Sequence, residues 1–165
     1  MRLLIALLLW SGSLSTIAQE FDDQRINEAI DTASTSDIMV PYVTMHNIWK
    51  YGTKEAKEEW ANKYGQCYWI WTDLIAIGFT YPNTYELSLS RMPLRAAIGA
   101  QIMAKSAGYD SKYAARSIIP RLQGDRRPIS YDSVYECTVL EMVLYKHLDE
   151  RRIAEKQSEI GQMSE

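Results

Sequence analysis

The chain has 165 residues, of which 47% are hydrophobic and 24% are charged. This balance is typical of a globular protein rather than a disordered or fibrous one, and the length fits a single domain. The formal net charge of −3 argues against general nucleic-acid binding, because that function requires a net basic surface.

The first 18 residues have the order of a secretory signal peptide. Met1 and Arg2 give a positive start, residues 3–10 form an unbroken apolar run, and residues 11–18 are mostly small or polar. We place the mature start at Gln19, and an uncleaved N-terminal anchor is the alternative. The apolar run is shorter than the ~20 residues that a spanning helix needs. We therefore expect a secreted or periplasmic protein with no transmembrane span in its mature part.

Two cysteines, Cys67 and Cys137, follow the signal segment. An even number of cysteines in an exported chain favours a disulfide, and a second possibility is a pair of free buried thiols. A metal site is disfavoured because zinc needs four ligands and only His46 and His147 could join the two cysteines. We predict a bridge between Cys67 and Cys137, and we predict neither a metal ion nor a cofactor.

The first helices are expected soon after residue 19. Residues 19–36 have sparse apolar positions and predict either a marginal helix or a loose N-terminal arm. Ser36 is the expected N-cap of a second helix, which should run to Tyr51 and stop at Gly52. This second helix opens the main helical domain, which we place at residues 37–157.

The third predicted helix has the clearest pattern. Thr53 is its expected N-cap, and one face carries apolar or small residues at alternating spacings of four and three: Trp60, Tyr64, Cys67, Trp71, Leu74 and Gly78. Gly65 lies inside this helix and indicates a kink or a close contact with another helix. A fourth helix is expected over residues 92–107, with Pro93 in its opening turn and Gly108 at its end.

Two further helices complete the predicted fold. A short helix is expected over residues 111–119, ending at Pro120, and residues 120–128 form an exposed loop. The last helix should open with a capping box made by Ser133 and Glu136, and residues 158–165 are expected to be a frayed tail. The apolar face of this helix contains Val134, Cys137, Leu140, Leu144 and Leu148.

The predicted fold is therefore all-α. No segment has an alternating apolar pattern long enough for a sheet, so we expect a compact bundle of about five helices. Cys67 and Cys137 each lie in the middle of an apolar stripe, one on each of two long helices. A disulfide between them would link these two helices.

Sequence motifs for nucleotide binding, nucleophilic catalysis and metal-dependent hydrolysis are absent, and no catalytic residue is assigned. Asp73 and Glu141 are carboxylates among apolar neighbours, where burial would raise their pKa values. Either could act in acid catalysis if His46 or His147 lay within hydrogen-bond reach. The alternative is that each carboxylate reaches water or an arginine at the edge of its stripe.

Aromatic residues are concentrated between positions 49 and 85. A single core stripe can bury only some of them, and exposed Tyr and Trp side chains are common anchors of protein interfaces. The predicted partner-binding residues are Tyr68, Trp69, Tyr81 and Tyr85. If neighbouring helices surround this region, the same residues belong to the core instead.

The loop of residues 120–128 carries Arg121, Arg126 and Arg127. Their guanidinium groups could bind a phosphate, a carboxylate or an acidic partner. The alternative is a solvated loop with no ligand.

Together these features favour an exported module that binds another protein of a bacterial envelope, such as an inhibitor or immunity-type protein. One alternative is a small envelope hydrolase that uses a buried carboxylate, and another is a structural or chaperone-like envelope component with a broad apolar groove. Exposure of Tyr68 and Trp69 would support the first hypothesis. The sequence predicts no particular partner, substrate or oligomeric state.

Overall fold

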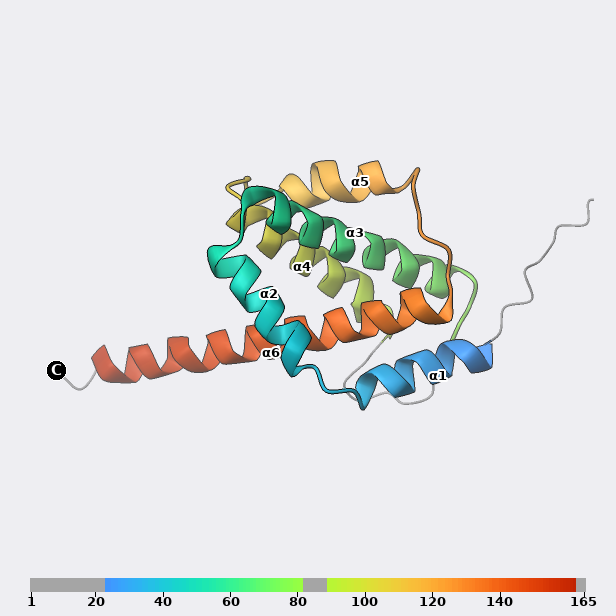
Figure 1. Ribbon diagram of the computed structural model, residues 1–165, viewed down its shortest axis with the longest axis horizontal. Coiled ribbons are helices and arrows are strands. Elements are labelled where there is room, and N and C mark those ends of the chain that lie inside the picture. Colours follow the sequence, from blue (N-terminus) through green and yellow to red (C-terminus); the bar gives the residue numbers. More distant parts are fainter. Residues whose placement is uncertain (1–22, 82–88, 163–165) are drawn as a thin grey trace, which may run out of the picture.

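The computed structural model describes residues 23–81 and 89–162, and within these ranges the regular structure is helical (Figure 1). The predicted all-α fold is confirmed. The elements are α1 (Asp23–Ser34), α2 (Met39–Tyr51), α3 (Lys54–Ala76), the 3₁₀ turn η1 (Leu89–Arg91), α4 (Met92–Ser106), the π-helical turn η2 (Ala114–Ile118), α5 (Ile119–Leu122) and α6 (Tyr131–Gln162). The predicted signal peptide lies outside the described residues.

Helix α6 runs through the whole bundle and packs against most of the other helices (Figure 1). Helix α1 lies along its first half, and α2 packs against its middle. Helices α3 and α4 lie side by side, and α5 packs against α3. The C-terminal end of α6 extends beyond the bundle. No helix in the described ranges combines the length and the apolar character that crossing a bilayer requires.

Within the segment 19–36, which could have been a loose arm, Asp23–Ser34 is helical. Helix α1 buries one face against α6 because its apolar residues recur at spacings of three and four: Ile26, Ala29, Ile30 and Ala33.

A disulfide joins Cys67 on α3 to Cys137 on α6, as predicted. The two Cα atoms are 5.3 Å apart, and the bridge closes a separation of 70 residues along the chain. Both cysteines are buried in the core. The bridge therefore fastens the two long helices at the centre of the bundle.

Two glycines allow close packing on α3 and α4. A Cβ atom at Gly65 would lie 2.7 Å from Leu122, so this glycine allows α5 to approach α3. A Cβ atom at Gly99 would lie 2.5 Å from the ring of Tyr64, which is buried between α3 and α4. The hydroxyl of Tyr64 donates a hydrogen bond to the carbonyl of Leu140 at 3.1 Å and so connects this contact to α6.

The predicted N-cap of α3 is confirmed, but that of α2 is wrong. Thr53 accepts a hydrogen bond from a backbone amide in the first turn of α3. The hydroxyl of Ser36 instead donates to the carbonyl of Ala33 at 2.7 Å and closes the end of α1. Asp37 accepts from the amide of Met39 at 2.8 Å, so the carboxylate satisfies an amide at the start of α2.

The capping box of α6 lies three positions earlier than predicted. The amide of Ser133 donates to the hydroxyl oxygen of Ser130 at 3.2 Å. In return, the amide of Ser130 donates to the hydroxyl oxygen of Ser133 at 3.0 Å. Because the helix begins at Tyr131, Ser133 occupies the third helical position, where the prediction placed Glu136. Helix α6 then continues to Gln162.

The predicted stop at Pro120 is also wrong. The helical turns η2 and α5 follow each other without a break, and Pro120 lies in the first turn of α5. A proline is tolerated there because an amide in the first turn has no partner within the helix. The exposed connection consequently begins after Leu122, which is buried.

Candidate functional site

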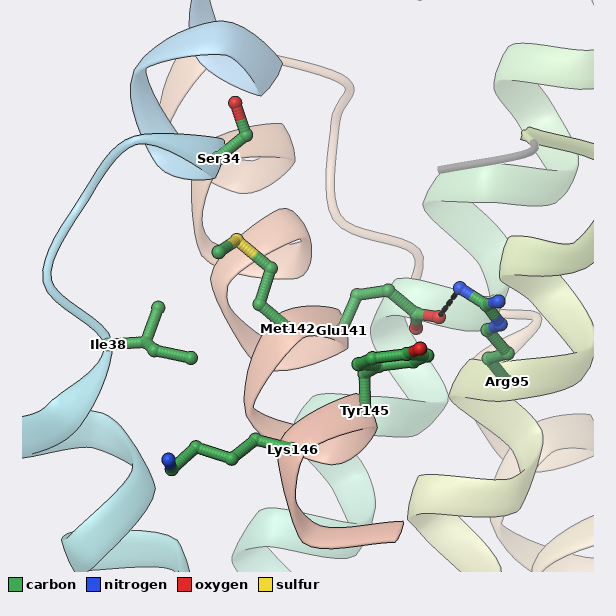
Figure 2. Close-up of a pocket in the computed structure, with 7 residues that line it drawn as sticks. All are labelled: Ser34, Ile38, Arg95, Glu141, Met142, Tyr145 and Lys146. Carbon is green, nitrogen blue, oxygen red and sulfur yellow. Dashed lines mark hydrogen bonds and ion pairs between the residues drawn. The ribbon is translucent and has the colours of Figure 1, made fainter. Parts of the chain in front are cut away.

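A pocket of about 190 Å³ lies between the segment that joins α1 to α2, helix α4 and helix α6 (Figure 2). We call it the Glu141 pocket. Its lining residues are Ser34, Ile38, Arg95, Glu141, Met142, Tyr145 and Lys146. Four of them lie on two successive turns of α6, where spacings of three and four place side chains on one face.

The acidic group of the pocket is Glu141, which is only 2% exposed. One carboxylate oxygen accepts a hydrogen bond from Nη1 of Arg95 at 3.2 Å. The other oxygen has no hydrogen-bond donor among residues 23–81 and 89–162. Burial raises the pKa of Glu141 to about 7, although the positive charge of Arg95 acts in the opposite direction. The pocket therefore holds a carboxyl group that changes charge near neutral pH.

The walls of the Glu141 pocket are largely apolar. Ile38 and Met142 contribute aliphatic and thioether surface on one side, and the ring of Tyr145 lies beside the carboxyl group (Figure 2). Tyr145 is 57% exposed, and the guanidinium carbon of Arg95 lies 5.8 Å from its ring centroid. Tyrosine and arginine are enriched among the residues that dominate binding at interfaces.

Lys146 brings a second positive charge to the pocket. Its ammonium nitrogen lies 3.5 Å from a carboxylate oxygen of Glu150 and 5.0 Å from the ring centroid of Tyr42. The hydroxyl of Tyr42 also donates a hydrogen bond to Glu150. These contacts attach the start of α2 to α6 next to the pocket.

An exposed apolar surface begins immediately after Ile38. Met39, Val40 and Val43 are 48%, 74% and 47% exposed. Their spacing places them on one side of α2, while Tyr42 and Met45 face the core. We call these three residues the α2 ridge. Isolated exposed apolar side chains are ordinary in soluble proteins, but a cluster beside a pocket is a feature of interaction sites.

The two histidines lie close together at another point of the contact between α2 and α6. The ring centroids of His46 and His147 are 6.2 Å apart, and the ring of Trp49 lies 4.8 Å from that of His147. Nδ1 of His46 and Nε2 of His147 are buried and have no hydrogen-bond partner within the described part of the chain. Burial and the positive charge of Arg151 lower the pKa of His147. Their meeting was not predictable from the pattern of residues along the chain.

The arrangement needed for a carboxylate and histidine hydrolase does not form in the described part of the chain. Glu141 pairs with Arg95, and Asp73 pairs with Arg126 at 2.6 Å. Neither carboxylate has a hydrogen bond to a histidine there. The same residues contain no group of three or more His, Cys, Asp or Glu side chains that could hold a metal ion.

The predicted aromatic surface is partly packed against the protein itself. Tyr68 and Trp69 are half-buried, and the indole nitrogen of Trp69 donates to the carbonyl of Ile119 at 2.8 Å. The hydroxyl of Tyr81 donates to Asp31 at 2.5 Å. Tyr85 lies outside the described residues. Tyr68 and Trp69 are thus neither freely exposed nor removed from the surface.

The three arginines predicted to bind an anion each contact a neighbour in the same chain. Arg121 donates to the side-chain oxygen of Asn62 at 2.7 Å. Arg126 pairs with Asp73 and covers the ring of Trp69 at 4.0 Å.

The third of these arginines, Arg127, pairs with Glu136 at 2.5 Å. These intramolecular contacts occupy the guanidinium groups that the prediction assigned to an external ligand.

The chain matches no family of known proteins, no curated protein and no solved structure. Sequence reasoning singled out Glu141 but missed Arg95, Tyr145 and the α2 ridge. The sequence did contain a signal for the α2 ridge. Met39, Val40 and Val43 are apolar, although they lie on the side of α2 opposite the residues that the helix buries.

Proposed function

We propose that this protein is an exported protein-binding module, of the inhibitor or immunity type, that engages a partner in the bacterial envelope. The observation that carries the proposal is the α2 ridge next to the Glu141 pocket. A ridge can insert into a concave partner surface while the pocket receives a side chain in return. Such pairing of a buried anchor with its pocket provides most of the affinity at many interfaces.

Export is the second part of the proposal. The signal-like first 18 residues support it, and so does the disulfide between α3 and α6, because disulfides persist in oxidising compartments. A secreted or periplasmic location would place the α2 ridge in contact with other envelope proteins.

The test is affinity capture from an envelope extract with the oxidised chain from Gln19 onward as bait. Val40→Lys places a charge in the middle of the α2 ridge. Tyr51→Lys is the matched control, because both native residues are 74% exposed and lie on α2. A captured partner is then purified, and its Kd is measured by calorimetry.

We expect a saturable partner whose affinity falls at least about tenfold with Val40→Lys and stays unchanged with Tyr51→Lys, since a charge on an apolar contact loses roughly 1.4 kcal/mol or more. Equal affinity for both variants would contradict the assignment of the α2 ridge. Trp69→Ala tests the aromatic surface predicted from the sequence. A loss of binding confined to that variant would move the interface to α3.

A further inference from the structure

The Glu141 pocket has room for one aromatic ring. Its volume is about 190 Å³, whereas an apolar cavity of about 150 Å³ in another protein is large enough to bind benzene. Apolar surface from Ile38, Met142 and the Tyr145 ring suits a flat apolar group, since methionine sulfur and aromatic faces both pack well against rings. The remaining volume allows a small substituent on that ring.

The buried end of the pocket offers a hydrogen-bond acceptor. Arg95 occupies one oxygen of Glu141, and in Figure 2 the second oxygen points away from Arg95 toward the Tyr145 side of the pocket. A ligand that donates a hydrogen bond to this oxygen would pair an acceptor that has no donor among residues 23–81 and 89–162. An entirely apolar ligand would cover the oxygen without pairing it, which costs free energy.

The charges around the pocket disfavour a cationic ligand. Arg95 pairs directly with Glu141, and Lys146 carries a second positive charge, which is paired with Glu150 at 3.5 Å. An ammonium or guanidinium group would approach Glu141 only by coming close to Arg95, whose Nη1 already lies 3.2 Å from the carboxylate. The chemistry therefore favours a neutral donor over a lysine or arginine side chain.

We propose that the Glu141 pocket binds the phenolic side chain of a tyrosine on the partner, with the tyrosine hydroxyl donating to Glu141. The ring then lies between the wall of Ile38 and Met142 and the ring of Tyr145. This inference rests on the proposed protein-binding function and specifies the group that the pocket recognises. The α2 ridge would provide the surrounding apolar contact.

The probe is p-cresol, which is the side chain of tyrosine, compared with 4-methylanisole and benzylamine. In 4-methylanisole the hydroxyl proton is replaced by a methyl group, and benzylamine carries a cation on a ring of similar size. Each compound is titrated into the oxidised protein at pH 8, and the backbone amide signals of Met142 and Tyr145 are followed by NMR. At this pH Glu141 is mostly ionised, because its pKa is about 7.

We expect saturable shifts at Met142 and Tyr145 and a preference of about tenfold for p-cresol over 4-methylanisole, which is the effect of one hydrogen bond to a charged acceptor. Benzylamine should also bind more weakly than p-cresol, because its positive charge would lie close to that of Arg95. Glu141→Met should remove the preference over 4-methylanisole. Glu136→Met is the matched control, since Glu136 lies on the same helix outside the Glu141 pocket, and it should leave the preference unchanged.

Equal affinity for p-cresol and 4-methylanisole in the native protein would overturn the inference, even if Glu141→Met does not fold. A preference that persists in a folded Glu141→Met variant would overturn it as well. These results are separable from the protein-binding proposal, which depends on Val40. Capture that is sensitive to Val40→Lys, together with no response to p-cresol, would retain the interface and remove only the tyrosine assignment.

Discussion

Glu141 is a carboxyl group that the fold holds in a protonation state unlike that of an exposed glutamate. Burial raises its pKa from an ordinary value of 4.5 to about 7. The folded protein therefore holds a proton on Glu141 at pH values where the unfolded chain has lost it. The stability that this proton provides is full below pH 4.5 and is lost as the pH rises through 7.

This titration predicts a pH-dependent difference between the native protein and Glu141→Gln. Between pH 5 and pH 8 the free energy of unfolding of the native protein should fall by ~2.5 kcal/mol relative to that of the variant, because each pKa unit corresponds to about 1.36 kcal/mol. Urea unfolding of both proteins across this range measures the difference. A constant difference between them at every pH would contradict the raised pKa.

The titration of His147 changes the stability of the protein with pH in the opposite direction to that of Glu141. Burial lowers its pKa below the ordinary 6.5, so its contribution to stability is present above pH 6.5 and is lost as the pH falls. The comparison with Glu141→Gln removes this contribution because His147 is the same in both proteins. Among the residues that the structure describes, Nε2 of His147 has no hydrogen-bond partner, so the two histidine rings of α2 and α6 meet without a hydrogen bond between them.

At the scale of the helices, Gly99 allows the closest packing between α3 and α4. An added Cβ would lie 2.5 to 2.7 Å from three atoms of the Tyr64 ring. That ring is fully buried and its hydroxyl is bound to Leu140, so it has little freedom to move. Overpacking of a core typically costs about 1–3 kcal/mol, whereas replacing a helical glycine with alanine gains only about 1 kcal/mol.

We therefore expect Gly99→Ala to destabilise the protein by up to about 2 kcal/mol, the amount by which overpacking exceeds the gain in helix propensity. Gly124→Ala is the matched control, since a Cβ at Gly124 would meet nothing within 4 Å. That change should alter stability by less than about 0.5 kcal/mol. Urea unfolding of the two variants checks both values. Stabilisation by Gly99→Ala would contradict this prediction and would mean that the Tyr64 ring moves to accommodate the added methyl group.

The faces of the helices were easier to predict from the sequence than their first residues, for physical reasons. The face of α3 was predictable because its apolar residues keep a regular spacing and Thr53 caps it. The cap of α2 was misplaced because Ser36 suits the start of a helix but instead closes the end of α1. The cap of α6 was misplaced because Ser130 and Ser133 are both suitable caps, and only the course of the chain decides between them. Local patterns identify a helix more reliably than they identify its first residue.

The Glu141 pocket was only partly predictable for a different reason. Glu141 was recognisable as a carboxylate among apolar residues, but its partner Arg95 lies on α4, 46 positions away. Single-sequence patterns contain no direct information on which helices pack together. The pairing of Cys67 with Cys137 was predictable because the chain has only these two cysteines.

At the scale of the whole molecule, the disulfide restricts the conformations that are open to the unfolded chain. It closes a separation of 70 residues and joins α3 to α6, the two longest helices of the described ranges. Closing a loop of this length should stabilise the protein by roughly 4 kcal/mol through the lost entropy of the unfolded state. This amount is a large share of the total free energy of unfolding of a domain of this size.

Reduction of the disulfide should therefore lower the free energy of unfolding by roughly 4 kcal/mol. Urea unfolding with and without a thiol reductant measures the effect. The double variant Cys67→Ala and Cys137→Ala is the control, since it should resemble the reduced protein and should not respond to the reductant. An unchanged unfolding midpoint after complete reduction would contradict the prediction. A large decrease would mean that the helical bundle, with the α2 ridge and the Glu141 pocket on its surface, depends on an oxidising compartment for its stability.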